Sequence, residues 1–137
     1  MKTFFDSSAF AKRYVDEPGS DIVEEICLNS AYLALSIICV PEILSALNRR
    51  LRENKLNQRN YMIAKNRLLE EIEDIIILNI TPPVINKSIE LLENNILRIM
   101  DALHIACAIE WQPDIFVSSD QRQIEVAQKL GLSINFI

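Results

Sequence analysis

The chain has 137 residues, the usual size of one domain with a core that needs no disulfide bond or structural metal. Its three cysteines are widely spaced and form no CxxC pair, which favours a reducing cytosol over an oxidising compartment. The longest apolar stretch, residues 31–40, is interrupted by Ser36 and ends at Pro41, so it resembles neither a secretory leader nor a membrane span. We therefore expect one cytoplasmic domain over residues 1–137, without a membrane partner.

The net charge of -5 argues against a general nucleic-acid binder, but the charges are unevenly distributed. Between Asn48 and Arg67 the chain carries seven basic residues and only one acidic residue, Glu53. Such a segment is either a solvated surface or a weak site for phosphate groups. The residues nominated for that second role are Arg49, Arg50 and Arg52.

Strand and helix patterns alternate along the chain, with no repeat, no low-complexity segment and no linker. The apolar runs predict strands over residues 3–5, 32–36, 75–78, 115–117 and 133–136. Amphipathic spacing, caps and prolines predict helices over residues 7–14, 20–29, 39–52, 57–72, 81–94, 99–111 and 123–130. This order is typical of an α/β fold in which helices cover both faces of a central, mainly parallel sheet.

Four carboxylates stand beside apolar runs at the ends of these elements. Asp6 and Asp120 follow predicted strands, whereas Glu42 and Asp101 lie in the first turns of predicted helices. In open parallel sheets the ligand crevice lies beyond the carboxyl ends of the strands, where the strand order reverses. Converging carboxylates suit Mg²⁺ or Mn²⁺, which prefer hard oxygen ligands and can activate water for attack on phosphorus. The pattern favours a metal-dependent phosphodiester hydrolase.

Each acid also has a simpler interpretation. Asp6 and Asp120 could be ordinary helix N-caps, and Glu42 and Asp101 could be acids favoured by the helix dipole. His104 lies one turn after Asp101, but a lone histidine on an apolar helix is more often a hydrogen-bonded core residue, so we leave it out of the metal ligands. Ser118 and Ser119 could orient a metal-bound water beside Asp120 or merely end the strand, so both are candidate supporting residues.

Four motifs occur in a fixed order along the whole chain. They are residues 4–14 (FFDSSAFAKRY) with 17–20 (EPGS), residues 41–47 (PEILSAL), residues 97–106 (LRIMDALHIA), and residues 117–120 (VSSD) with 127–132 (AQKLGL). Together they closely resemble the motifs of PIN-domain ribonucleases of the VapC toxin type. The four acids occupy the family's acidic positions, without a departure.

The resemblance implies a PIN-like three-layer α/β/α fold and a Mg²⁺- or Mn²⁺-dependent ribonuclease from a toxin-antitoxin pair. Asp6 and Asp101 match the most direct metal ligands, Glu42 and Asp120 the positions that complete the site, and Ser118 a frequent Thr or Ser. The implied partners are an RNA substrate, a VapB-like antitoxin and a second copy of the chain in a homodimer.

Other classes fit the residues less well. A receiver-type phosphoacceptor needs an acidic pair after its first strand, and a haloacid-dehalogenase-like phosphatase needs Asp where Ser8 stands. No glycine-rich loop follows any strand, which excludes a P-loop or dinucleotide enzyme. Two alternatives stay open: a structure-specific DNA nuclease with the same metal chemistry, and a non-catalytic PIN-like module that binds RNA or protein.

Overall fold

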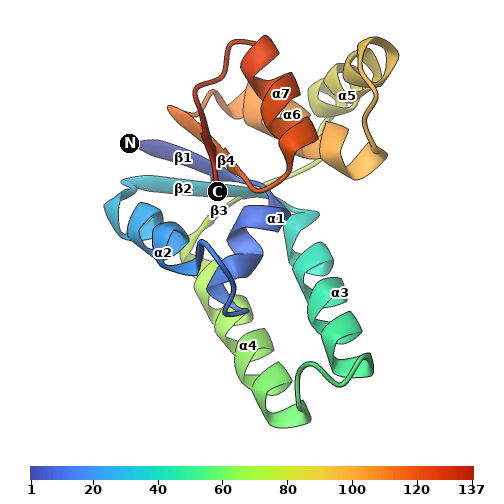
Figure 1. Ribbon diagram of the computed structural model, residues 1–137. Helices are drawn as coiled ribbons and strands as arrows, with labels where there is room; N and C mark the ends of the chain where they lie inside the picture. The colour runs from blue at the N-terminus through green and yellow to red at the C-terminus, as the bar shows by residue number, and fades with distance from the viewer.

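A computed structural model describes all residues, 1–137, and its centre is a five-stranded sheet in the order β3-β2-β1-β4-β5 (Figure 1). All four neighbouring pairs are parallel. The strands are β1 (Lys2–Phe5), β2 (Tyr32–Ser36), β3 (Ile76–Leu78), β4 (Ile115–Ser118) and β5 (Ile134–Phe136). The predicted parallel sheet is therefore confirmed.

Helices cover both faces of this sheet. The α-helices are α1 (Ser7–Phe10), α2 (Ser20–Asn29), α3 (Cys39–Arg52), α4 (Gln58–Glu71), α5 (Pro82–Asn94), α6 (Ile99–Trp111) and α7 (Gln121–Lys129), with short 3₁₀ turns η1 (Ala11–Arg13) and η2 (Ile72–Asp74). Figure 1 shows α5, α6 and α7 on one side of the sheet and α1 to α4 on the other. The three-layer α/β/α prediction is confirmed.

The alternation of side chains along each strand divides the core into two halves. Phe4 and Phe116 belong to the cluster with α5, α6 and α7, and their rings stack at 5.7 Å. Phe5 and Val117, one position further along, pack with the apolar faces of α1 to α4. Neighbouring residues of a strand thus contact opposite helix layers, and a shift of one residue in the strand pairing would exchange them.

Small differences from the predicted elements have local causes. The predicted helix over residues 7–14 tightens into η1 at Ala11. The helix predicted from Gln123 begins at Gln121 because Asp120 caps it. β3 pairs only with β2 at the sheet edge, so Ile76 stays exposed although its run is apolar on both sides.

No helix is both long enough and apolar enough to cross a membrane. None of the three cysteines forms a disulfide bond.

Candidate active site

The candidate site lies at the carboxyl ends of β1 and β4. These strands are neighbours, but β1 continues by way of α1 toward β2, whereas β4 continues by way of α7 toward β5 on the other side. This is the reversal of strand order at which open parallel sheets leave a crevice. Asp6 directly follows β1, and Asp120 follows β4 after one residue.

Asp6 is completely buried and caps α1. Its Oδ1 accepts a hydrogen bond from the Ala9 backbone N–H at 3.0 Å, and its Oδ2 accepts one from the Ser118 hydroxyl at 2.7 Å. The Ser8 hydroxyl lies 2.8 Å from both carboxylate oxygens. Burial raises the pKa of Asp6 even though these neutral donors favour its charged form. No basic side chain touches this carboxylate, so its negative charge is left without a direct counter-charge.

Ser118 connects Asp6 with Asp120. Its hydroxyl donates to Asp6 and accepts a hydrogen bond from the Asp120 backbone N–H at 2.9 Å. The neighbouring Ser119 hydroxyl is buried without a partner, and only the Ser119 backbone N–H joins the network, through Ser8 at 3.0 Å. Of the two candidate serines, Ser118 is the one whose side chain contacts the acids.

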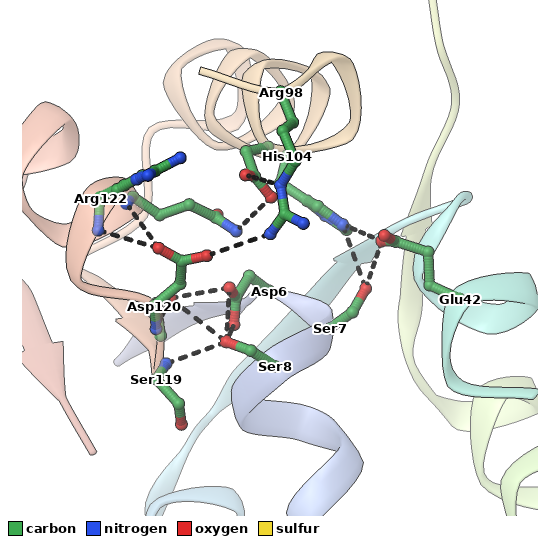
Figure 2. Close-up of polar contacts among 12 residues, drawn as sticks. Asp6, Ser7, Ser8, Glu42, Arg98, His104, Ser119, Asp120 and Arg122 are labelled. Carbon is green, nitrogen blue, oxygen red and sulfur yellow. Dashed lines mark hydrogen bonds and ion pairs between the residues drawn. The ribbon is translucent and has the colours of Figure 1, made fainter. Parts of the chain in front are cut away.

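Asp120 divides its carboxylate between a helix cap and the site. Oδ1 accepts the backbone N–H groups of Arg122, at 2.8 Å, and Gln123, at 3.3 Å, and so caps α7. Oδ2 faces the Arg98 guanidinium at 3.8 Å (Figure 2). The capping interpretation of Asp120 is therefore confirmed, while its second oxygen is not used by the cap.

Asp101 lies in the first turn of α6, held between two donors. Its Oδ1 accepts a hydrogen bond from Gln123 Nε2 at 3.0 Å, and its Oδ2 accepts one from Arg98 Nε at 3.3 Å. Burial and the negative charge of Asp120 raise the pKa of Asp101, and the cationic Arg98 opposes that shift. The Arg98 guanidinium contacts both Asp101 and Asp120, so the two carboxylates share one positively charged neighbour.

Glu42, in the first turn of α3, makes hydrogen bonds to residues other than those that connect the three aspartates. Its Oε1 accepts hydrogen bonds from the Ser7 hydroxyl at 2.7 Å and from His104 Nε2. Burial acts to raise the pKa of Glu42, but the hydrogen bonds from His104 and Ser7 outweigh it, so the pKa is lowered. His104 is buried with Nδ1 unpartnered, and its Nε2 contacts Glu42 and Ser7.

The predicted acids share one edge of the sheet without forming a finished coordination sphere. Asp6, Asp120 and Asp101 are linked in that order through Ser118 and Arg98. No three side chains of the His, Cys, Asp and Glu types lie close enough together to hold a metal ion. Glu42 and Asp101 line one cleft of about 580 Å³, together with residues 97–100.

A comparison with protein-family models decides the family. The model described as "PIN domain" matches residues 3–129, nearly the whole chain. The chain belongs to the PIN domain family. Among proteins of curated function, a sequence comparison finds no match.

Solved structures share the fold of this PIN domain at low sequence identity. VapC20 of Mycobacterium tuberculosis, described as a sarcin-ricin-loop-cleaving toxin, is 16% identical with a TM-score of 0.70 over 90% of this chain and 94% of its own. FitAcB of Neisseria gonorrhoeae is 16% identical with a TM-score of 0.74 over 98% and 96%. VapBC2 of Rickettsia felis, bound to promoter DNA, is 14% identical with a TM-score of 0.70 over 100% and 99%.

Several polar residues of this PIN domain were not nominated from the sequence. Arg98 stands three residues before Asp101, a spacing at which two side chains at the start of a helix can contact each other. This spacing could have indicated Arg98 from the sequence. Ser7, Ser8 and Gln123 have no such signal, because ordinary helix starts contain the same residue types. Their roles depend on the packing of α1 and α7 against β4.

The three nominated arginines lie away from the acids. Arg49, Arg50 and Arg52 are in the last turn of α3, at the far end of the α3–α4 hairpin from the sheet (Figure 1). Arg50 pairs with Glu17 at 3.3 Å, whereas Arg49 and Arg52 are exposed. Glu42 and Arg49 are separated by about 10 Å along the axis of α3.

Proposed function

We propose that this PIN domain is a Mg²⁺- or Mn²⁺-dependent endoribonuclease and the toxin of a type II, VapBC-like toxin-antitoxin pair. The observation that supports it most strongly is Asp6, a fully buried carboxylate contacted only by neutral donors at the sheet's switch point. Buried charges are normally paired or bound to a cation. Asp6 is therefore a carboxylate that needs a cation.

The chemistry of the donor set suits such an ion, although no three of these side chains lie close enough together to hold it in the present arrangement. Asp6, Asp101 and Asp120, with Glu42 completing the site, supply only hard carboxylate oxygens, and Asp101 and Asp120 already turn toward one positive charge. This chemistry suits Mg²⁺ or Mn²⁺ rather than a thiolate- or imidazole-bound metal. A bound divalent cation supplies an acidified water and neutralises charge on the phosphoryl oxygens.

The chain's own residues orient these carboxylates, and they favour the charged form of Glu42. Ser118 and Ser8 fix both oxygens of Asp6, which prevents the side chain from turning away from the edge. His104 and Ser7 hold Glu42 in its charged form at the rim of the cleft. No serine, cysteine or lysine nucleophile is required, because water attacks phosphorus.

The proposed protein partners are inferred from the solved structures that share this fold. VapBC2 of Rickettsia felis and FitAcB of Neisseria gonorrhoeae, the VapBC-type and FitAB-type structures compared above, support an antitoxin partner here. A homodimer is proposed on the same family resemblance. The unpaired cysteines agree with a cytoplasmic protein.

The deciding experiment is a cleavage assay with purified, antitoxin-free protein. Single-stranded RNA and a DNA of matched sequence are incubated with Mg²⁺, Mn²⁺ or EDTA, beside the variants Asp6→Ala and Asp101→Ala. We expect RNA to be cut with a divalent cation, EDTA to stop cutting, and both variants to be inactive.

The open alternatives predict different results in this assay. Cutting of both polymers favours the structure-specific DNA nuclease, since the 2′-hydroxyl is then not needed. Binding without cutting, under either metal and with cellular RNA as substrate, favours the non-catalytic module and contradicts the proposal.

A further inference from the structure

Arg98 occupies the space between two of the proposed metal ligands. It is the N-cap residue of α6, and its guanidinium contacts Asp101 Oδ2 through Nε at 3.3 Å and Asp120 Oδ2 through Nη2 at 3.8 Å (Figure 2). The Arg98 side chain is 77% exposed, whereas the Asp101 side chain is only 9% exposed. A solvent-facing cation thus rests on two more buried carboxylates.

These contacts do not resemble a structural ion pair. Neither is the bidentate fork of a strong arginine–carboxylate pair, and exposed pairs of this kind contribute little to stability. The side chain also makes no capping bond to α6. Arg98 can therefore leave the carboxylates at a small cost, without disturbing the helix.

The space that Arg98 can enter borders Asp101 and a third acid, Glu42. Arg98 lines the cleft of about 580 Å³ shared by Glu42 and Asp101. The other walls of this cleft are Leu97, Ile99 and Met100, which offer no positive charge. Arg98 is thus the cationic donor available there to an anionic group such as a phosphate.

We propose that Arg98 and the divalent cation compete for Asp101 Oδ2 and Asp120 Oδ2, and that the displaced guanidinium binds the substrate phosphate in the cleft. This inference rests on the proposed function. Two positive charges on the same oxygens repel each other, so metal binding drives the guanidinium toward the cleft. There its planar fork matches two non-bridging oxygens of a phosphate. Arg98 therefore couples metal loading to substrate binding.

The test measures two binding affinities that should change in opposite directions. Isothermal titration calorimetry follows Mn²⁺ alone, and then adenosine 5′-monophosphate in the presence of saturating Mn²⁺, a probe that the enzyme does not cut. In Arg98→Ala we expect Mn²⁺ to bind about three- to fivefold tighter, since the competitor is gone. We expect adenosine 5′-monophosphate to bind about tenfold or more weakly, since a charge-assisted donor is lost.

Arg122→Ala is the matched control. Arg122 is on the other side of Asp120, and only its backbone N–H contacts that carboxylate. Its removal deletes the same charge near the site, and so measures the long-range electrostatic effect alone. Arg98→Lys keeps the charge without the fork, so we expect near wild-type Mn²⁺ affinity but weakened binding of adenosine 5′-monophosphate.

Two results overturn the inference. One is a Mn²⁺ affinity in Arg98→Ala equal to that of Arg122→Ala, and the other is unchanged affinity for adenosine 5′-monophosphate. If wild-type protein still cleaves RNA in either case, the proposed function stands and the role of Arg98 alone is wrong. A wild-type protein that neither binds Mn²⁺ nor cleaves RNA overturns both.

Discussion

Asp6 illustrates a residue whose charge reduces the stability of the fold that holds it. Because burial raises its pKa above the ordinary value of 3.8, the folded state binds a proton more readily than the unfolded state. Its contribution to stability is therefore complete at low pH and is lost as pH rises toward the raised pKa. Ionisation of this buried side chain is a net cost to stability, which the proposed cation would relieve.

Replacing Asp6 with Asn should therefore stabilise the protein without metal. The amide keeps an oxygen for the Ala9 N–H and can donate to the Ser118 hydroxyl, but removes the buried charge. We expect a gain of about 1 kcal/mol, or roughly 4 °C in Tm, in EDTA at pH 7. The variant should also lose cleavage and the increase in Tm that we expect millimolar Mn²⁺ to give the wild type.

Differential scanning calorimetry with EDTA and with Mn²⁺ checks this prediction. Asp74→Asn is the control, because Asp74 is exposed and its removal should leave both midpoints unchanged. A Tm for Asp6→Asn that falls in EDTA would show that the carboxylate's hydrogen bonds outweigh the cost of its charge.

Ser118 gives a second prediction at the residue scale. Ser118→Ala removes one donor from Asp6 and one acceptor from the Asp120 backbone, both in a buried network. We expect Mn²⁺ affinity and cleavage to fall about 10- to 100-fold, the usual effect of losing a group that orients a metal ligand. Ser118→Thr keeps the hydroxyl and should restore most of both. Equal defects in the two variants, measured by calorimetric titration and RNA cleavage, would point to simple packing damage.

At the scale of elements, most of the fold follows from local signals in the sequence. Strand periodicity, the Pro41 start, the Asp120 cap and the Gly131 turn place the helices and strands within a few residues. The parallel sheet then brings the ends of β1 and β4 together, which explains why Asp6 and Asp120 could be paired in advance.

What the sequence leaves open depends on long-range packing. The Asp101 and Asp120 side chains are joined only through Arg98 and Gln123, and no local pattern predicts which donors fill the space between two acids. The same limit applies to Glu42, whose hydrogen bond to His104 joins α3 to α6 across 62 residues of sequence.

Glu71 shows how charge joins separate elements far from the site. Located at the end of α4, it accepts hydrogen bonds from Tyr14 at 2.8 Å and from Arg13 at 3.0 Å, and so ties α4 to η1 and the residue that follows it. Burial acts to raise the pKa of Glu71, but the bonds from Tyr14, Arg67 and Arg13 outweigh it and lower the pKa below 4.5. Its stabilising contribution is present above about pH 4.5 and is lost as pH falls through the lowered pKa.

Glu71→Gln should therefore destabilise the protein in a pH-dependent way. We expect a loss of about 1–3 kcal/mol in the free energy of unfolding at pH 7, the range for hydrogen bonds to charged groups. The difference from wild type should shrink in acid, where both side chains are neutral. Urea denaturation at neutral and acidic pH measures it, and Glu70→Gln is the control because Glu70 is exposed on the same helix. An equal loss at both pH values would contradict the assigned charge effect.

At the scale of the whole molecule, the two signs of charge are separated along one helix. α3 begins near Glu42 at the acidic edge and ends in Arg49, Arg50 and Arg52, and its 14 residues span about 21 Å. A single strand of RNA that follows this helix would have its scissile phosphate near the acids and its neighbouring phosphates near the arginines. Outside residues 48–67 the chain carries 7 basic and 18 acidic residues, so the rest of the molecule is on balance unfavourable for a polyanion.

Neutralising the three arginines tests this arrangement. In the Arg49→Ala/Arg50→Ala/Arg52→Ala variant, we expect weaker binding of single-stranded RNA whatever its sequence, because phosphate contacts carry no sequence information. Each lost contact lowers the slope of log affinity against log salt by about 0.7. Arg50 is already paired with Glu17, so Arg49 and Arg52 should account for most of the change. Fluorescence anisotropy in EDTA measures the slope, with Lys87→Ala/Lys129→Ala as the control on α5 and α7. If the three arginines bind RNA phosphates, removing them must reduce the number of counterions released and therefore the slope. An unchanged slope in the triple variant would mean that RNA reaches the acids by another path.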